Sequence, residues 1–441
     1  MIASFPQAFR RALQHRSRWM LLVLASLVLS SGAAAPPPQA AAAPSGLTAA
    51  DWTAISSQLP LSLTQQAYLK AAPSGPDDSF GISVAISGNT VLVGASGEDS
   101  NGSGPADNSA PNAGAAYVFV HRDGAWIQQA YLKASNITTN AAFGRSVAIN
   151  GDTIVVGAEG EPFENVVNAG AAYVFKRSGT SWTQQAYLRP ASLDLLWNSY
   201  FGHSVAIDGN TIVVGAVDES SNAIGVNGAV TGYSFSSGAA FIFVRTENTW
   251  SQQAHLKASN REGNDHFGES VTIDSDTVVV GAWGEDSAAT TVNGDQTDNG
   301  ALSGGAAYVF VRNGATWSQQ AYLKPSNLNA GDTFGFSLAL DGDRLVVGAP
   351  LEASAATGVD GNQSDNSANR AGAAYLFQRL DGVWSQQTSL KASNTEAGDW
   401  FGWSVALAGD TIAIGAAHEA SNAIGLDGAQ SNNTAAEAGA A

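Results

Sequence analysis

From residue 64 onward, the chain repeats a pattern of short apolar runs separated by glycine-rich turns. Its cleanest copy covers residues 143–189 and reads FGRSVAINGDTIVVGA, then an acidic spacer, then GAAYVFKRSGTSWTQQAYLR. The run TIVVGA is β-branched and too short for a helix, which is typical of a strand buried on both faces. SVAI before it, and AAYVF and TQQAYL after it, also have the length of strands. The pattern therefore predicts four short strands in each copy.

Turn signals join these predicted strands in pairs. Asn150-Gly151, Asp208-Gly209 and Asp341-Gly342 stand between the first two strands of their copies. Asn-Gly and Asp-Gly tolerate positive φ at both central positions of a turn, so they predict type I′ hairpins. Arg122-Asp123-Gly124 and its equivalents predict a second hairpin between the third and fourth strands. Each copy is then a four-stranded antiparallel unit.

A Phe-Gly pair opens every copy, and successive pairs lie 58 to 67 residues apart. The six phenylalanines are Phe80, Phe143, Phe201, Phe267, Phe334 and Phe401. A period of this size indicates a repeat architecture. Radially repeated four-stranded sheets are the blades of a β-propeller, and a ring leaves fewer open edges than a stacked solenoid. We predict an all-β propeller of six blades; a seventh would need a copy that the sequence does not show.

The two ends of the array are incomplete copies. At its start, LTQQAYLK (residues 63–70) matches a fourth strand, not a first one. The sixth copy stops at AEAGAA, where the others continue into Tyr-Val-Phe or a close variant. We expect an incomplete last blade, which the N-terminal strand could complement only in part because the third strand is missing. This indicates either a truncated chain or a ring with a defective last blade.

The Phe-Gly pairs and the Gly-Ala pairs that follow them resemble the FG-GAP repeat, found in integrin α-subunits and in many exported bacterial proteins. The resemblance covers residues 64–441, and the Gly-Ala pairs begin at Gly94, Gly157, Gly215, Gly281, Gly348 and Gly415. It implies a propeller and a role in adhesion or ligand binding at the cell surface. Integrin blades often carry an Asp-x-Asp-x-Asp-Gly calcium loop between the two motifs. Here INGDT and IDGNT leave room only for a tight hairpin, so that calcium site is not expected at these positions.

Composition and charge exclude several classes of partner and of chemical site. The chain has 441 residues, 38 acidic against 20 basic groups, and a formal charge of −18. Such a surface repels phosphate backbones and anionic membranes, so we expect no nucleic-acid partner. The absence of cysteine excludes disulfides, cysteine-zinc sites and thiol nucleophiles. We expect a monomer.

Residues 1–33 have the pattern of a secretory signal peptide. Four arginines precede the apolar run Met20 to Leu29, and Ser31-Gly32-Ala33 supplies small residues for cleavage. A run of ten is short for a membrane span, which needs about 20 residues, so an uncleaved anchor is the weaker alternative. Cleavage would remove four positive charges and take the formal charge from −18 to −22. The mature protein is then expected outside the cytoplasm, secreted or at the cell surface, without a membrane span.

Residues 34–63 are predicted to be an Ala/Pro-rich linker that includes one short helix. The first part, AAPPPQAAAAPSG, lacks the varied apolar residues of a packed core. The helix is expected from Leu47 to Leu59, with Thr48 as N-cap and Pro60 as its stop. Residues 64–441 form the propeller domain.

The acidic spacers between the second and third strands contain the only candidate metal ligands. The copies TVNGDQTDNG (residues 291–300) and GVDGNQSDNS (residues 358–367) offer oxygen ligands suited to a hard cation such as Ca²⁺. The candidate ligands are Asp295, Asp298, Asp360, Asn362 and Asp365. We favour the alternative that these residues make turns and solvate a loop, and otherwise expect no cofactor.

Other repeated residues are interpreted as structural. Acidic residues just after each Gly-Ala pair, such as Glu98 and Glu285, are interpreted as solvated charge on the rim, since a catalytic pair should be unique. Trp126, Trp182, Trp250, Trp317 and Trp384 open the fourth strands and are expected to pack between blades. Trp197, Trp283, Trp400 and Trp403 break this pattern and are better candidates for ligand contact, although packing is favoured for them too. Of each Gln-Gln pair, one amide is expected in solvent and one against the neighbouring blade.

No catalytic motif stands out, so the sequence favours an exported, non-enzymatic binding module. Its rim loops would recognise a protein or a carbohydrate. One alternative is a hydrolase or lyase on the same scaffold, which would need a unique cluster of polar residues at the central channel. Another is a structural segment of a larger surface protein.

Overall fold

Every regular element of the structure, a computed structural model, is a β-strand in the part of the chain it describes. That part comprises residues 66–72, 74–192, 198–425 and 428–441. None of these residues belongs to a helix that could cross a membrane. The predicted signal peptide, the linker with its helix at 47–59, and Trp197 lie outside the described residues.

The strands form five four-stranded antiparallel sheets and one two-stranded sheet, with strands in sequence order. The first sheet comprises β1 (Phe80–Ser87), β2 (Thr90–Ala95), β3 (Ala115–Arg122) and β4 (Ala125–Leu132). The second comprises β5 (Phe143–Asn150), β6 (Thr153–Ala158), β7 (Ala171–Ser178) and β8 (Ser181–Leu188). The third comprises β9 (Phe201–Asp208), β10 (Thr211–Ala216), β11 (Ala239–Thr246) and β12 (Thr249–Leu256). The fourth comprises β13 (Phe267–Asp274), β14 (Thr277–Ala282), β15 (Ala306–Asn313) and β16 (Thr316–Leu323). The fifth comprises β17 (Ser337–Asp341), β18 (Arg344–Ala349), β19 (Ala373–Leu380) and β20 (Val383–Leu390), and the last comprises β21 (Phe401–Ala408) and β22 (Thr411–Ala416).

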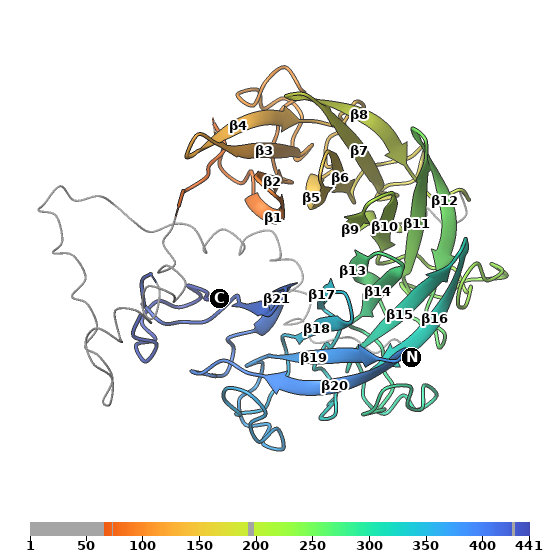
Figure 1. Cartoon of the computed structure of the whole chain (residues 1–441), viewed down its shortest axis with the longest axis vertical. Helices are drawn as coiled ribbons and strands as arrows, with labels where there is room; N and C mark the ends of the chain where they lie inside the picture. Colours follow the sequence, from red (N-terminus) through yellow and green to blue (C-terminus); the bar gives the residue numbers. More distant parts are fainter. Residues whose placement is uncertain (1–65, 73, 193–197, 426–427) are drawn as a thin grey trace, which may run out of the picture.

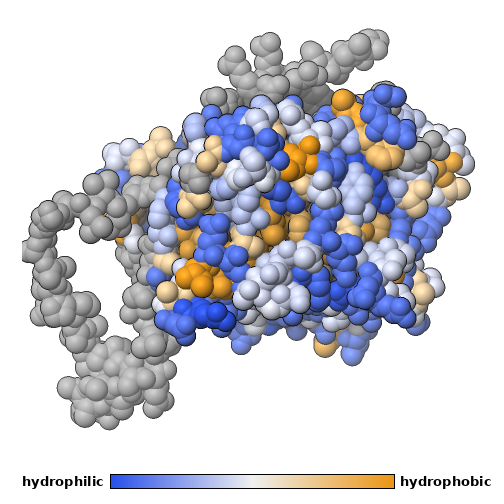
Figure 2. Space-filling model, turned by 90° about the horizontal axis from the view of Figure 1, so that it is seen from above, coloured by the Kyte–Doolittle hydropathy of each residue, from blue (hydrophilic) through white to orange (hydrophobic). Residues whose placement is uncertain are grey.

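These sheets are arranged as blades around a central opening, with the first strand of each blade innermost (Figure 1). The predicted all-β, propeller-like arrangement of six repeats is confirmed. The described strands leave the ring open between β21 and β1, where Val84 and Ile86 of β1 are 60% and 66% exposed. Their equivalents Val147 and Ile149 are buried against the first blade. Seen edge-on, the surface is mainly hydrophilic, with scattered apolar residues (Figure 2).

The last blade is incomplete, as predicted. Among the described residues only β21 and β22 form it, and the far edge of β22 carries a single bridge, from Ala416 to Ala440. All six residues of β6, β10 and β14 are buried, whereas in β22 only Ala416 is. The residues 66–72 form no strand, but Leu69 and Ala71 pack on the first blade. They occupy the place that Leu132 and Ala134 occupy against the second blade.

The Phe-Gly and Gly-Ala motifs make the seam between neighbouring blades. Ser83 Oγ donates a hydrogen bond of 2.8 Å to the carbonyl oxygen of Gly144 in the next blade. That carbonyl group lies so close to Gly94 that a Cβ atom at position 94 would overlap it. The same arrangement recurs at Gly157, Gly215, Gly281 and Gly348. Glycine is therefore required because two backbones approach each other there.

The turns between first and second strands differ from the prediction. Asn150 pairs with Thr153, so the two central residues are Gly151 and Asp152, not Asn150 and Gly151. Only Gly151 has a positive φ, of 55°. Positive φ at the first central position alone is the pattern of a type II′ turn, so the predicted type I′ geometry is wrong here.

A clamp of arginine, tryptophan and glutamine joins neighbouring blades near these turns. Arg312 bonds Asp276 of its own blade, at 2.7 Å from Nε, and Thr211 of the preceding blade, at 3.0 Å from Nη1. Its guanidinium lies over Trp317, whose indole N–H donates to Gln253 of the preceding blade at 2.8 Å. Equivalent indole-to-glutamine bonds join Trp182 to Gln129, Trp250 to Gln185 and Trp384 to Gln320. The expected packing of these tryptophans between blades is confirmed.

The prediction that one amide of each Gln-Gln pair lies in solvent is wrong for Gln252-Gln253. Gln253 accepts the indole bond from the next blade, while Gln252 accepts a bond from the backbone N–H of Ala191 in the linker from the preceding blade. Gln319 likewise donates to Ser259. Both amides of a pair are thus used between blades, one on each side, because the two faces of an outer strand meet different neighbours.

Replacing Trp317 by phenylalanine should lower the free energy of unfolding by more than about 1 kcal/mol, the usual net contribution of one hydrogen bond. Phenylalanine cannot donate the bond to Gln253, and its smaller ring also gives up part of the contact with Arg312. Trp126→Phe is the matched control, because Trp126 makes no such bond within the described residues. Urea denaturation of both variants provides the comparison, and equal losses would contradict the role assigned to the bond.

Candidate functional site

The two faces of the ring carry different kinds of residue. In the first blade Phe80 pairs with Ala95, and Ser87 pairs with Thr90. The Phe-Gly pairs, the Gly-Ala pairs and the long spacers therefore share one face, which we call the spacer face. The short turns within each blade lie on the opposite, hairpin face.

Each spacer begins with a buried glutamate, and in four blades a lysine pairs with it. The Nζ to Oε2 distances are 2.7 Å for Lys133–Glu98, 2.7 Å for Lys257–Glu219, 2.6 Å for Lys324–Glu285 and 2.6 Å for Lys391–Glu352. Their interpretation as solvated charge is wrong, since Glu219 and Glu352 have no exposed surface. The lysine follows the fourth strand and reaches back to the end of the second strand.

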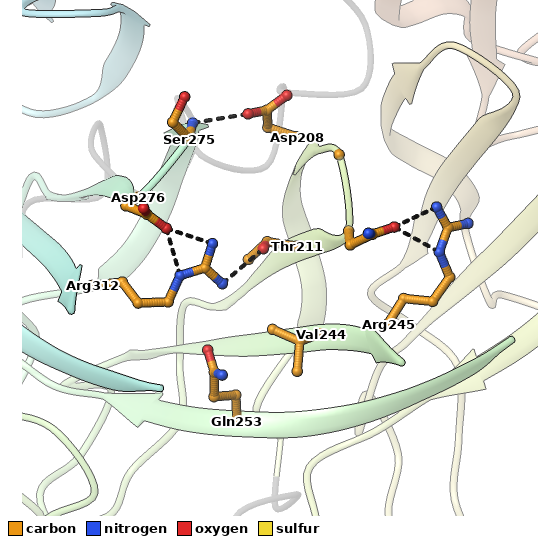
Figure 3. Close-up of a pocket in the computed structure, with 10 residues that line it drawn as sticks. Asp208, Thr211, Val244, Arg245, Gln253, Ser275, Asp276 and Arg312 are labelled. Atoms are coloured by element: carbon orange, nitrogen blue, oxygen red, sulfur yellow. Dashed lines mark hydrogen bonds and ion pairs between the residues drawn. The ribbon is translucent and has the colours of Figure 1, made fainter. Parts of the chain in front are cut away.

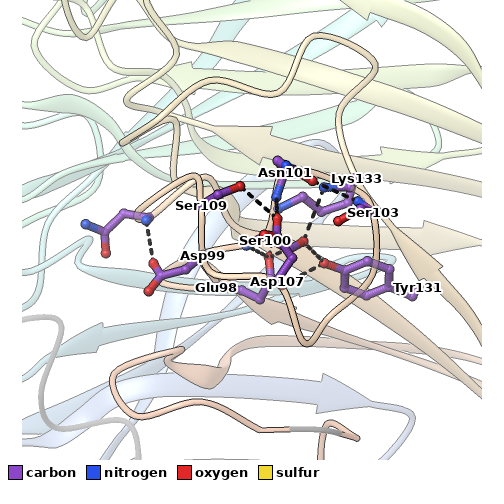
Figure 4. Close-up of polar contacts among 11 residues, drawn as sticks. Glu98, Asp99, Ser100, Asn101, Ser103, Asp107, Ser109, Tyr131 and Lys133 are labelled. Atoms are coloured by element: carbon purple, nitrogen blue, oxygen red, sulfur yellow. Dashed lines mark hydrogen bonds and ion pairs between the residues drawn. The ribbon is translucent and has the colours of Figure 1, made fainter.

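Around Glu98 the carboxylate is fully engaged (Figure 4). Tyr131 Oη donates to Oε1 at 2.7 Å, and Lys133 and the backbone N–H of Ser100 donate to Oε2 at 2.7 and 3.2 Å. Burial lowers the pKa of Lys133, and the Glu98 carboxylate opposes that effect. A buried ion pair with this many hydrogen bonds fixes the start of the spacer.

Two blades depart from this arrangement. In the second, Arg189 replaces the lysine, and its Nη2 is 4.0 Å from Oε1 of Glu161. Burial raises the pKa of Glu161 to about 7, against the lowering effect of Arg189. In the sixth, Glu419 is 3% exposed and forms no ion pair within the described residues.

A second buried carboxyl group lies beside the pair in the fourth and fifth blades. Burial raises the pKa of Asp265 from 3.8 to about 7, and that of Asp332 by the same cause to about 7. Nearby Glu285 adds to the rise for Asp265, while the N–H of Glu262, which donates to its Oδ2 at 2.6 Å, opposes it.

Asp265 should make stability fall as pH rises. Its folded pKa lies above its unfolded value, so the folded state binds the proton more tightly, and its contribution is lost between about pH 4 and pH 7. Asp265→Asn should remove a slope of up to about 1.4 kcal/mol per pH unit over that range. Denaturant titrations from pH 4 to pH 8 measure it. Asp295→Asn serves as control, because the pKa of Asp295 is lowered by bonds from Thr297. Parallel profiles for wild type and Asp265→Asn would contradict the assignment.

The predicted metal ligands are placed in separate turns of the spacer loops. Asp295 accepts bonds from Thr297, and Asp298 from the N–H of Gly300. Asp360 accepts from Thr388 and Ser389, Asn362 from Ser364, and Asp365 from Ser367. Within residues 66–72, 74–192, 198–425 and 428–441, no three His, Asp or Glu side chains form a group that could hold a metal ion. The calcium site stays a prediction that these contacts do not favour.

Three positions per blade differ in every copy, although the residues beside them repeat. They lie directly before Phe-Gly, directly after Phe-Gly and directly after Gly-Ala, at the spacer-side ends of the first and second strands of each blade. The first set is Ser79, Ala142, Tyr200, His266, Thr333 and Trp400. The second is Ile82, Arg145, His203, Glu269, Phe336 and Trp403, and the third is Ser96, Glu159, Val217, Trp283, Pro350 and Ala417. We call these the axial positions.

The axial residues directly before Phe-Gly have an unusual backbone conformation. All six residues have φ between 51° and 60°, in the left-handed region. Tyrosine, threonine and tryptophan rarely adopt it, at a cost of roughly 1–3 kcal/mol each. The repeated turn imposes this geometry, so the choice of side chain is not set by backbone preference.

The axial positions of the second to fourth blades form a polar sector. Arg145 Nε lies 3.0 Å from Oε1 of Glu159, and His203 Nδ1 lies 2.6 Å from Oε2 of Glu159. His203 Nε2 lies 3.5 Å from Oε2 of Glu269 in the fourth blade. Burial lowers the pKa of His203, but Glu269 and Glu159 outweigh it and leave the pKa raised. One chain of charges thus links three consecutive blades.

Aromatic rings occupy three of the six axial positions of the fifth and sixth blades, at Phe336, Trp400 and Trp403. The Trp403 ring centroid lies 4.6 Å from that of Phe336 and 5.1 Å from that of Trp400. Trp400 is also 4.1 Å from the ring of His418. All four side chains are half-buried. By contrast Trp283 is 8% exposed and stacks on His266, as the packing interpretation expects.

The third spacer adds two exposed aromatic residues to the same face. Ser221 and Tyr233 form an isolated antiparallel β-bridge, and the N–H of Ser234 donates to the carbonyl oxygen of Ser220 at 2.7 Å. This loop is therefore a small hairpin. Tyr233 and Phe235 are 64% and 61% exposed, while Ser234 between them is 9% exposed. Alternation along the extended backbone points both rings to solvent.

A cavity of about 420 Å³ lies on the hairpin face between the third and fourth blades (Figure 3). Arg312 in its wall bonds Asp276 and Thr211, and Ser275 donates to Asp208. These residues belong to the repeated contacts between blades. We therefore interpret the cavity as part of the clamp between blades. The variable residues of the spacer face are the candidate functional site.

Of the axial residues only Trp283, Trp400 and Trp403 were singled out in the sequence, although a signal for the whole set was present. Six different residues stand at each position while Phe, Gly and Ser beside them recur. Comparison of the internal repeats alone could have found them. What could not be seen was that residues from separate blades, such as Glu159 and His203, lie in contact.

The fold and the seam between neighbouring blades define a propeller-like ring of repeats. Folds of this class serve as binding or recognition modules. A sequence model of the FG-GAP repeat matches residues 63–119, 126–175, 182–243, 250–310, 317–377 and 384–432. The chain belongs to the FG-GAP repeat family. The second to sixth matches each begin in a fourth strand, one strand before the blade that they mostly cover. A comparison with curated proteins finds no match.

Proposed function

We propose that the chain is an exported, non-enzymatic binding module that recognises a protein or carbohydrate through its spacer face. The observation that carries the proposal is the contrast between repeated and non-repeated positions. Repeated residues make the contacts that recur between successive blades, whereas residues that differ in all six copies gather at the inner edge of one face. The recurring contacts therefore do not depend on which side chain stands at these variable positions.

Exposed aromatic residues support the choice of face. Aromatic side chains combine a large apolar area with few rotatable bonds, and they are enriched where proteins bind partners. Trp403 and Phe336 near the opening, and Tyr233 and Phe235 on the third spacer, provide such groups. The excess of acidic residues disfavours nucleic acid as the partner.

A test is to probe the purified chain on an array of defined oligosaccharides and a panel of immobilised extracellular proteins. Trp403→Ala and Tyr233→Ser should each reduce the signal at least tenfold without unfolding the protein. Ile127→Ser, on a fourth strand and 46% exposed before substitution, should leave it unchanged. Equal binding by all three variants would contradict a site on the spacer face.

A hydrolase is the second candidate function, and the polar sector is the observation that supports it. Glu159, His203 and Glu269 are non-repeated titratable groups in mutual contact. They are bonded to one another, which leaves none of them aimed at a substrate, so we rank this second. Release of reducing sugar or peptide from the same panel, lost in His203→Ala, would favour it over binding alone.

A further inference from the structure

Two cationic side chains meet between the second and third blades, on the hairpin face. Lys176 Nζ and Arg245 Nη1 both donate to the hydroxyl oxygen of Thr153, each at 3.3 Å. The ion pairs formed by the described residues include neither of these cations. Thr153 is 2% exposed, whereas Lys176 and Arg245 are half-buried, so solvent reaches both charges. Like charges held this close repel each other, and an anion beside them relieves the repulsion.

The equivalent arginines of three other blades each have a carboxylate partner. These pairs are Arg177–Asp152, Arg312–Asp276 and Arg379–Asp343, each at 2.6 Å. In the third blade Asn210 stands at the place of the aspartate, and its neutral Oδ1 accepts from Nε and Nη2 of Arg245 at 2.9 and 2.6 Å (Figure 3). Arg245 therefore keeps the hydrogen bonds of the repeat without the negative charge.

The lysine is a second departure from the repeat at the same place. Lys176 pairs with Thr153 across the second and third strands of its blade. The residues at the equivalent position of the other complete blades are uncharged, namely Val120, Val244, Val311 and Gln378. The asparagine and the lysine thus place two positive charges beside one threonine, in a chain whose formal charge is −18.

The donors around Thr153 suit an oxyanion. Arginine has five N–H groups, and the bonds of Arg245 to Asn210 and Thr153 use three of them, which leaves two for a ligand. Arginine and lysine bind phosphate and sulfate groups through such charge-assisted hydrogen bonds. The acidic groups elsewhere on the chain oppose this only weakly, because exposed charges are screened beyond about 8 Å at physiological ionic strength.

We propose that Lys176, Arg245 and Thr153 form a binding site for a tetrahedral oxyanion, a phosphate or sulfate group, on the hairpin face. Its negative charge takes the part that an aspartate carboxylate takes in the equivalent arginine pairs, and its several oxygens accept from arginine and lysine together. The site lies on the face opposite the spacer loops, so it is separate from the ligand site proposed above. A free ion and an ester on a larger molecule offer the same chemistry.

Isothermal titration calorimetry of the full chain with sodium sulfate and sodium phosphate, at an ionic strength held constant with sodium chloride, tests this. Each anion should bind saturably, at one site per chain. Lys176→Val installs the residue of three other blades, and Asn210→Asp supplies the carboxylate of the other pairs, so both variants should fold. Each should weaken binding at least tenfold. Lys70→Val removes an exposed lysine elsewhere and should leave binding unchanged.

Phenyl phosphate and phenyl sulfate distinguish the two sources of the group. Tighter binding of the esters than of the free ions would identify an ester as the ligand, and equal or weaker binding would identify the free ion. Several results would overturn the proposal. These are no saturable binding of sulfate or phosphate, an equal response to sodium acetate, or wild-type affinity in Lys176→Val and Asn210→Asp. The comparison of anions needs only the wild type, so it remains decisive if a variant does not fold.

Discussion

Gly281→Ala should lower the free energy of unfolding by at least about 3 kcal/mol, at or beyond the upper end of ordinary overpacking costs. The added methyl group would overlap the backbone carbonyl of Gly335 in the fifth blade and the hydroxyl of Ser270 in its own. A side chain can rotate away, but the carbonyl is held by the Ser270 hydrogen bond at 2.8 Å and by the strand behind it. The two blades would have to separate. Urea denaturation followed by tryptophan fluorescence measures the loss.

Gly415→Ala is the matched control within the same chain. Gly415 stands at the equivalent place in the sixth blade, but the new methyl group would meet only Ser404 there. No following blade places a carbonyl against it in the described residues. We expect a loss of less than about 1 kcal/mol. Equal losses at positions 281 and 415 would contradict the assignment of the Gly-Ala motif to the seam.

Lys257→Met should cost about 3–5 kcal/mol, because it leaves a buried carboxylate without its cation. Both Lys257 and Glu219 have no exposed side-chain surface, and Lys257 Nζ also donates to Ser237 at 2.8 Å. Methionine fills a similar volume, so the loss would come from charge and not from a cavity. Thermal and denaturant unfolding measure it.

Two further variants separate the charge effect from a general sensitivity of the fold. Adding Glu219→Leu to Lys257→Met should recover a large part of the loss, since no unpaired charge remains. Lys70→Met replaces an exposed lysine and should change stability by less than about 0.5 kcal/mol. A double variant no more stable than the single one would show that the charge is not what the site requires.

Local patterns were sufficient to predict the strands and their arrangement. Runs such as TIVVGA have the β-branching and short length of strands buried on both faces, and their period predicted the ring and its incomplete sixth blade. The interblade role of Trp317 followed from its fixed place in each copy. These features depend on neighbours within one copy or on their regular recurrence, which the sequence displays directly.

Contacts that cross between strands far apart in the chain could not be predicted in the same way. Glu285 looks like surface charge in the sequence, because Lys324 that neutralises it lies 39 residues away. Asn150-Gly151 suggested a type I′ turn, whereas the strand register moves the turn by one residue. The glycine of the Gly-Ala pair is required because the backbone of the next blade lies against it, and a single copy of the repeat does not show that contact.

The central claim is that repeated residues hold the ring together, whereas the non-repeated axial residues provide the binding surface. Phe334 and Phe336 test it most directly, because the same residue type occupies both kinds of position two residues apart. Phe334 is fully buried against Tyr375 and Phe377, and Phe336 is half-buried against Trp403. The free energy of unfolding should fall by about 3–5 kcal/mol in Phe334→Ala and by less than about 1 kcal/mol in Phe336→Ala. Equal losses would show that the axial position is structural and would contradict the account.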